Sequence, residues 1–420
     1  MKTSMTKMAA LTSALMLATS CATTKNDKNE AMAVRPSVAE DVDAQYLILS
    51  DHQREIIDKN NQFAVKLFQQ VAGLNSTVVS PISVTYLMAM LANGADAQTK
   101  ADIVKALQLS GNDLDEANAL YKMMIERAGA YDKTTVCRLA NYLAFNKNID
   151  IKPAYAAAMK DTYHAAVEGL DFTSSKTAAR INDWCKKSTE GMIPSIINDV
   201  DPNAMAYIMN AIYFNGTWTQ KFEKRDTKEE PFRGYTRNIM RVPMMHMTEK
   251  LRYGSNDTYA SVALPYGNGA YSMTILLPHN GQSVDDVLKA IADKKVNEMG
   301  QEASDCIVDL KLPRFTSDVE TPLNNVIAKL GAASMFGPQA DFSHISNSPL
   351  FVSKMFQKAK IEVSEEGTKA AAVTAAIMTM SALPTEQPKH VTFHANHPFV
   401  YMITENNTGS ILFMGQYAGE

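Results

Sequence analysis

A run of small residues near the C-terminus, from Glu365 to Ala376, constrains the fold of this chain more than any other segment. The run lies between two strongly apolar segments, and the side chains of a strand alternate between its two faces. One face would carry nothing larger than threonine and no charge: Thr368, Ala370, Ala372, Thr374 and Ala376. Such a segment can stay exposed as a loop and can also enter the middle of a sheet without a clash or an unpaired charge. Because alanine is the strongest helix former, a helix stays open as the alternative for these residues alone.

The composition is that of an ordinary globular protein. The chain has 420 residues, of which 46% are hydrophobic and 20% charged, and this suffices for a large core. Length alone allows two or three domains or one large domain. The formal net charge is -4 and no cluster of lysine and arginine stands out, so we expect no binding of nucleic acid and no general attraction to acidic membranes.

The N-terminus has the pattern of an export signal. A basic start precedes a short apolar stretch from Met8 to Ala18, which is too short to span a bilayer as a helix. Small residues then lead to Cys21, as in a bacterial lipoprotein cleavage site, although a leucine usually stands where this chain has Ala18. We therefore predict a signal peptide at residues 1–21 with cleavage before a lipidated Cys21. Ordinary secretory cleavage near that point is the alternative.

The residues that follow predict where the exported protein is held. Residues 22–45 are mostly small and polar and are expected to form a flexible tether. A lipid on Cys21 would anchor the protein at a bacterial envelope or cell surface, and that anchor would be its one membrane attachment. Without the lipid the protein would be periplasmic or secreted.

The cysteines form neither a disulfide framework nor a zinc site. If Cys21 carries lipid, an odd set with irregular spacing remains: Cys137, Cys185 and Cys306. At most one disulfide can form among the three, and buried thiols that contribute to packing are the expected state.

Helical patterns come first along the chain and strand patterns follow. Ser80-Pro81 predicts a helix start, apolar residues continue on one face, and Gly94 predicts the end. After about Thr135, short apolar runs rich in β-branched and aromatic residues predict buried strands. These runs are 206–214, 271–277, 350–355, 399–403 and 411–417, and a turn signal at Glu405–Gly409 predicts that the last two form a hairpin. This order indicates an α+β fold.

Separate motifs in a fixed order resemble the serpin family. Their agreement runs from about His52 to Tyr417. They are Ser80-Pro81-Ile82-Ser83 with residues 91–95, Ile181-Asn182-Asp183-Trp184 with Thr189-Glu190-Gly191, residues 210–218 followed by Phe222, Thr227 and Phe232, Leu312-Pro313-Arg314-Phe315, Ala340-Asp341-Phe342-Ser343, Glu365-Glu366-Gly367-Thr368, and His397-Pro398-Phe399 with residues 409–413.

The resemblance implies a single serpin domain over residues 46–420, with eight or nine helices around three β-sheets. It also implies an exposed reactive-centre loop at about residues 366–390. In serpins a target serine protease cleaves this loop and forms an acyl-enzyme, after which the loop enters the large sheet and carries the protease to the opposite end. An inserted strand of about fourteen residues would span roughly 45 Å, which is comparable to the diameter of a small domain.

The resemblance assigns the hinge of the loop to Glu366, Gly367, Thr368, Ala370 and Ala372. Glycine tolerates the change of backbone conformation between loop and strand. The threonine enters the sheet first, where a charge would cost several kcal/mol to bury. No proline occurs between Gly367 and Leu383, so the inserting part keeps its ladder hydrogen bonds.

Family spacing from the hinge places the scissile bond at Ser381-Ala382 or one residue earlier at Met380-Ser381. The bait from Ile377 to Leu383 contains no arginine or lysine, which disfavours proteases with a trypsin-like pocket. Elastase-like, subtilisin-like or chymotrypsin-like proteases are the expected targets, and cysteine proteases are secondary ones.

Five further residues match family positions that control opening of the large sheet. They are Ser80, Ser83, Asn210, Gln357 and Trp218. Gln357 stands where the family usually has histidine, and an amide can both donate and accept hydrogen bonds. Trp218 matches the position where insertion begins, a role that is compatible with simple core packing.

Other classes of function are less well supported by the sequence. There is no Gly-x-Ser-x-Gly or His-Glu-x-x-His motif, so we expect no enzymatic activity and no catalytic residue. His390 and His394 would share one face of a strand while His397 points away, which does not favour a metal site. We expect no cofactor, a monomer, and a covalent complex with the target serine protease. A serpin that has lost inhibition and serves in binding or folding is the alternative.

Overall fold

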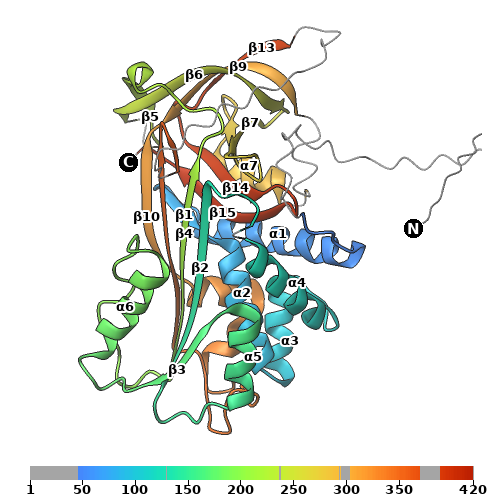
Figure 1. Cartoon of the computed structure of the whole chain (residues 1–420), viewed down its shortest axis with the longest axis vertical. Helices are drawn as coiled ribbons and strands as arrows, with labels where there is room; N and C mark the ends of the chain where they lie inside the picture. Colours follow the sequence, from blue (N-terminus) through green and yellow to red (C-terminus); the bar gives the residue numbers. More distant parts are fainter. Residues whose placement is uncertain are drawn as a thin grey trace, which may run out of the picture. The chain divides into compact units, whose positions relative to one another are not determined.

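The structure, a computed structural model, describes residues 46–128, 130–235, 238–292, 294, 303–368 and 388–419 (Figure 1). Its α-helices are α1 (Asp51–Val71), α2 (Pro81–Gly94), α3 (Ala97–Ala106), α4 (Asp113–Arg127), α5 (Pro153–Tyr163), α6 (Thr177–Ser188), α7 (Val284–Ile291) and α9 (Asn324–Ile327), with short η helices at Lys224–Asp226, Ala328–Ala332 and Ala333–Phe336. No helix in these residues is both long enough and apolar enough to cross a membrane.

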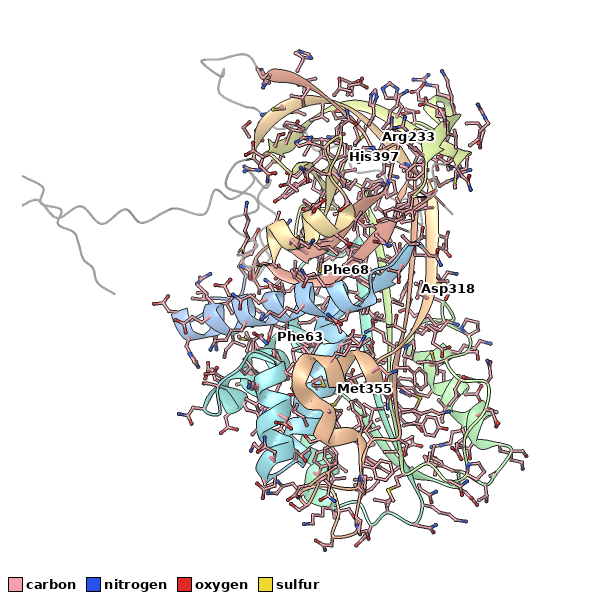
Figure 2. All side chains as sticks on the ribbon, turned by 180° about the vertical axis from the view of Figure 1, so that it is seen from behind. Phe63, Phe68, Arg233, Asp318, Met355 and His397 are labelled. Carbon is pink, nitrogen blue, oxygen red and sulfur yellow. The ribbon has the colours of Figure 1, made fainter. Side chains whose placement is uncertain are left out.

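The first two helices form because their apolar faces are covered, and α1 also has a capped start. Ser50 and Gln53 form a capping box at the start of α1, which satisfies backbone N–H groups of the first turn. Phe63 and Phe68 of α1 are at most 1% exposed (Figure 2). The helix predicted to begin at Ser80-Pro81 is confirmed as α2, which is apolar on every side and is therefore buried along its length.

A six-stranded sheet has the order β10-β11-β12-β4-β2-β3. Its strands are β2 (Thr135–Asn146), β3 (Ala166–Leu170), β4 (Ala206–Thr217), β10 (Phe315–Pro322), β11 (Lys354–Ser364) and β12 (Gly367–Thr368). Helices α2 to α5 lie on one side of this sheet and α6 on the other (Figure 1). Successive residues of β4 therefore enter different cores, with Ile208 in the larger core and Tyr207 in a smaller one beside α6.

A nine-stranded sheet has the order β1-β15-β14-β8-β7-β6-β9-β13, with β5 paired to β6. Its strands are β1 (Thr77–Val79), β5 (Lys228–Arg233), β6 (Ile239–Ser255), β7 (Tyr259–Tyr266), β8 (Tyr271–Pro278), β9 (Ser304–Pro313), β13 (Lys389–His394), β14 (Phe399–Glu405) and β15 (Ser410–Tyr417). The expected α+β fold is confirmed. The hydrogen bonds of the described residues join the strands into two sheets rather than three, because the long strand β6 pairs with β5 and β9 and then with β7.

Two local predictions have different outcomes. The C-terminal hairpin is confirmed, since β14 and β15 pair antiparallel across the predicted turn and Gly409 has a positive φ of 79°. The prediction of a strand from Leu350 to Met355 is wrong for most of its length, because β11 begins at Lys354. The backbone N–H groups of Val352 and Ser353 donate to Met335 and Ala206 instead of forming a ladder.

Candidate functional site

The short strand β12 lies between β11 and β4 at one end of the six-stranded sheet. Gly367 and Thr368 pair antiparallel with Ser364 and Val363 of β11, and on the other side with Thr217 and Gly216 of β4. The predicted hinge is thus reached directly from β11, through a tight turn at Glu365 and Glu366. Gly367 and Thr368 of the small-residue run are therefore already members of the sheet.

Beyond β12, strands β11 and β4 pair directly with each other. Residues Lys354–Lys360 of β11 pair in parallel with Tyr207–Tyr213 of β4. The sheet consequently has a seam between these strands, and β12 occupies its open end. A strand that continued from Thr368 along the seam would have to replace this parallel ladder with two antiparallel ladders.

Gly367 occupies a site that no other residue fits. Its φ is +141°, a conformation that residues with a Cβ rarely adopt. A Cβ at this position would meet the carbonyl oxygen of Gly216 at 2.2 Å and the Cα of Thr217 at 2.7 Å. Because both contacts are to backbone, β12 can lie this close to β4 only with glycine at the turn.

Thr368 is completely buried, and its hydroxyl has a specific partner. Its Oγ1 lies 2.7 Å from the hydroxyl oxygen of Tyr266, at the end of β7. The Tyr266 ring stacks on the Trp218 indole, with centroids 4.3 Å apart and planes inclined by 14°. The Tyr266 hydroxyl thus allows this polar side chain to be buried without an unpaired group.

Trp218 also fixes the turn between β11 and β12. Its indole Nε1 donates to the carbonyl of Ser364 at 2.9 Å, and its backbone N–H donates to the carbonyl of Glu366 at 3.0 Å. The backbone N–H of Phe222 donates to the carbonyl of Glu365 at 3.0 Å. Three carbonyls of the turn are therefore held by the segment that follows β4.

The two turn carboxylates are each matched by cationic side chains. Glu365 is 4% exposed and accepts hydrogen bonds from Thr227 at 2.8 Å and Arg314 at 3.3 Å. Glu366 lies nearer to solvent and forms ion pairs with Lys221 at 2.9 Å and Lys224 at 3.4 Å.

The hydrogen bond from Lys221 is the main reason that the pKa of Glu366 lies below its ordinary value. The ion pairs therefore favour the ionised carboxylate and hold the hinge where it meets the sheet.

A second cluster crosses the closed part of the seam. Gln357 of β11 accepts from the backbone N–H of Ser80 at 2.6 Å and donates to the Ser80 carbonyl at 3.0 Å. The same amide donates to Asn210 of β4 at 3.4 Å. Asn210 in turn donates to Asn141 of β2 at 2.9 Å, and the Ser80 and Ser83 hydroxyls lie 2.9 Å apart.

Separation of β11 from β4 would break few of the side-chain hydrogen bonds in this cluster. The one side-chain hydrogen bond between β11 and β4 in it, from Gln357 to Asn210, is its longest. The other bonds of Gln357 go to the backbone at the start of α2, and the amide of Asn210 is also held by Asn141. When β11 and β4 part, each amide keeps a partner on its own side, so little burial of unpaired polar groups results.

The structure brings part of the predicted site together. Glu366, Gly367, Thr368 and Trp218 meet at the open end of the seam, whereas Ser80, Ser83, Asn210 and Gln357 meet farther along it. Five predicted residues lie outside the described residues: Ala370, Ala372, Met380, Ser381 and Ala382. Cys21 and the tether at residues 22–45 lie outside them as well.

Sequence reasoning missed Asn141, Lys221, Lys224 and Tyr266. An amide within the strand pattern of residues 135–146 could have indicated Asn141. Nothing local distinguishes Tyr266, whose importance comes from its contacts with Thr368 and Trp218. In the part of the chain that the structure describes, no group of histidine, cysteine and acidic residues is arranged to hold a metal ion. Cys137, Cys185 and Cys306 are free thiols.

The chain is similar to known proteins along most of its length. Residues 58–419 match the profile of the family described as serpin (serine protease inhibitor). Human leukocyte elastase inhibitor is 33% identical over 381 residues, which cover 87% of this chain and 99% of that protein. A serpin-like protein of Thermococcus kodakarensis is 29% identical over 388 residues, covering 89% and 88% of the two chains.

Solved structures give the same result. The thermophilic serpin tengpin in its native state superposes with a TM-score of 0.79 at 28% identity, covering 89% of this chain and 96% of tengpin. Arabidopsis AtSerpin1 in its native stressed conformation gives 0.77 at 28% identity, covering 88% of this chain and 99% of that one.

Proposed function

This chain belongs to the serpin family, and on that basis we propose that it inhibits serine proteases as a suicide substrate. The observation that carries the proposal is β12, which enters the sheet between β11 and β4 with its small residues. A protease that cleaves the chain beyond β12 would free the following segment from its distal attachment. The segment could then continue the strand that Gly367 and Thr368 begin.

The hydrogen-bond pattern of the seam supplies a driving force. Before insertion β11 and β4 share one parallel ladder of seven residue pairs, Lys354–Lys360 with Tyr207–Tyr213. After insertion each of these strands would pair antiparallel with the new strand, as both already do at β12. Antiparallel pairing is slightly more stable per residue, and a second ladder is gained. The resulting free-energy difference is what would pull an attached protease along the sheet.

The small side chains keep the cost of insertion low. Both faces of β4 are buried, so a strand inserted beside it enters two packed cores. Thr368 already occupies such a site with its hydroxyl paired to Tyr266. Large or charged residues at the following alternate positions would need space or hydration that this sheet does not provide.

We infer that the targets are elastase-like, subtilisin-like or chymotrypsin-like serine proteases, with cysteine proteases as secondary targets. The absence of arginine and lysine from residues 377–383 supports this, and human leukocyte elastase inhibitor is among the similar proteins. The scissile bond would be Ser381-Ala382 or Met380-Ser381, and the inhibitor would act as a monomer without a cofactor.

The test is to mix the protein with such a protease and examine the products on a denaturing gel. A covalent complex with the mass of the protease plus most of the inhibitor is expected. The same protease with its catalytic serine replaced by alanine should form none. Mass spectrometry of the released C-terminal peptide would identify the cleaved bond. A chain that is only cut, with the protease still fully active, would instead indicate a serpin that serves in binding or folding.

We further propose that the protein is exported and lipid-anchored through Cys21. The apolar stretch Met8–Ala18 and the small residues before the cysteine support this. Mass spectrometry of the mature N-terminus, isolated from a bacterial host, tests the proposal. A chain that begins at Cys21 with an added diacylglyceryl mass is expected. An unmodified N-terminus would indicate a periplasmic or secreted protein.

A further inference from the structure

The strand β13 is attached to the molecule along one side only. It forms the edge of the nine-stranded sheet, and in the described part of the chain its ladder partner is β9 alone, over Lys389–His394. Phe393 is its one fully buried side chain. Among the described residues β13 is the next strand after the hinge strand β12, so it holds the chain on the C-terminal side of the segment that begins at the hinge.

A carboxylate between two imidazoles ties β13 to its neighbours. Asp309 of β9 lies between β6 and β13 in the sheet. Its Oδ1 is 2.7 Å from Nε2 of His246 on β6, and its Oδ2 is 3.1 Å from Nε2 of His394 on β13. Each oxygen of Asp309 thus has its own imidazole partner, and the three side chains bridge three adjacent strands.

The charged residue nearest to this cluster in the ladder, Lys311, is paired with a carboxylate outside it. Lys311 is in register with His246 on one side and His394 on the other, and Glu230 of β5 binds its Nζ at 2.8 and 2.9 Å. The register partners of Asp309 are uncharged threonines. The other charged or ionisable groups on the three strands include Lys250 and Asp305, which form an ion pair at 2.9 Å, and Arg241, which donates to the Glu229 carbonyl. The rest are Glu249, Arg252, Tyr253, Cys306, Lys389 and His390.

Imidazole is the side chain whose charge changes between pH 5 and pH 8. With both rings protonated Asp309 would face two cations, and with both rings neutral it would face none. A hydrogen bond between an imidazolium and a carboxylate is stronger than one from a neutral ring. His394 and Asp309 are 33% and 41% exposed, so solvent weakens the interaction without removing it.

We propose that His246, Asp309 and His394 form a proton-dependent clasp, which holds β13 on β9 more tightly in mildly acidic than in alkaline solution. His394 is the residue of β13 that takes part, at the end of the strand opposite to the reactive segment. Protonation of the imidazoles strengthens the clasp, and their deprotonation leaves β13 held by its backbone ladder and Phe393.

The clasp also has a lower pH limit. Burial acts to raise the pKa of Asp309, but the hydrogen bonds from His246 and His394 outweigh it and hold that pKa below its ordinary value. The carboxylate therefore stays ionised in mild acid and is protonated only as the pH falls through this lowered pKa. Below that value Asp309 is neutral, and the clasp should no longer contribute to the attachment of β13.

This inference has a consequence for inhibition, which rests on the proposed function. An uncut segment that is tethered at β12 and at β13 cannot follow the seam unless β13 leaves β9. A tighter clasp would keep the uncut protein in its active form for longer. In acid surroundings the inhibitor should therefore lose less of its capacity on storage.

Hydrogen exchange of the full chain tests the clasp without reference to inhibition. Exchange protection in β13 is measured relative to β14, corrected for intrinsic rates, at about pH 5.5 and pH 8 with EDTA present. We expect the protection of β13 relative to β14 to be about threefold greater at the lower pH, the size that half-exposed ion pairs allow. Asp309→Asn should abolish this difference, and His394→Asn should reduce it.

His164→Asn is the matched control, since His164 has a left-handed conformation that asparagine tolerates and lies away from the clasp. It should leave the pH dependence unchanged. Equal relative protection at both pH values, or a pH dependence that survives Asp309→Asn, would overturn the clasp. Neither result would affect the gel assay for covalent complexes, so failure of the clasp and failure of the inhibitor proposal are distinguishable.

Discussion

The hydroxyl oxygens of Tyr266 and Thr368 lie 2.7 Å apart in a fully buried site, although 102 positions separate the two residues in the chain. Tyr266 belongs to the nine-stranded sheet and Thr368 to the six-stranded sheet. This bond therefore links the hinge to a sheet it does not belong to. It gives the inserted threonine a partner that a loop conformation would lack.

Removing one partner of this bond should destabilise the protein. We expect Tyr266→Phe and Thr368→Val each to lower the free energy of unfolding by about 1–2 kcal/mol, because each leaves the other hydroxyl buried and unpaired. The double variant should cost no more than about one single variant. Urea unfolding of the four proteins measures this coupling. Strictly additive losses would mean that the two hydroxyls do not interact.

A charge at position 368 should convert an inhibitor into a substrate. Thr368 has no exposed surface, so Thr368→Arg would require burial of an unpaired guanidinium at a cost of several kcal/mol. We expect cleavage to continue at a similar rate while the yield of covalent complex falls at least tenfold. Thr368→Ser, which keeps the hydroxyl, is the matched control and should retain most of the yield. Equal yields from both variants would contradict the insertion mechanism.

Acidification should loosen the hinge through Glu366. The pKa of Glu366 is lowered chiefly by the hydrogen bond from Lys221. The ion pair therefore contributes its full stabilisation above the ordinary pKa of glutamate, and this stabilisation is lost as the pH falls through the lowered pKa. Trp218 can report this change once Trp184→Phe makes it the single tryptophan.

We expect its fluorescence to change between about pH 5 and pH 3, in the range where a carboxylate with a lowered pKa titrates. This change should be smaller in Glu366→Gln. Identical titrations of the two proteins would show that the ion pair does not hold the turn.

Cleavage beyond the hinge should make the protein harder to melt. Successive inserted residues add hydrogen bonds alternately to β11 and to β4. About 5 kcal/mol of net stabilisation corresponds to a rise in Tm of roughly 6 °C in a protein of this size. Calorimetry of the intact and the cleaved protein compares the two directly. The cleaved Thr368→Arg variant should show little of the rise, and a cleaved wild-type protein with an unshifted Tm would rule out insertion.

The sequence predicted those elements whose signals are local. Pro81 after Ser80 marked the start of α2, and the turn at Glu405–Gly409 marked the final hairpin. The strand prediction for Leu350–Met355 was wrong because apolar content indicates burial but not hydrogen-bond partners. Leu350 and Val352 are buried without belonging to a strand. Composition alone could not distinguish a buried strand from a buried segment that lies outside a sheet.

Long-range polar partners were beyond the reach of the sequence. Glu365 and Glu366 are adjacent, yet one is buried beside Arg314 and Thr227 while the other meets Lys221 and Lys224 near the surface. No spacing rule connects these positions. Their pairing follows from the turn between β11 and β12 and from the segment after β4 that packs over it.

The amino-acid sequence by itself determined that residues 368–376 could occupy a sheet, since small uncharged side chains on one face and the absence of proline are properties of the chain. It also determined the family and the α+β architecture. Only the tertiary structure decided that Gly367 and Thr368 already lie between β11 and β4, with Tyr266, Trp218 and the lysines holding them. The physical reason is that a residue's capacity to enter a strand is local, whereas an open place between two strands exists only when distant segments have folded around it.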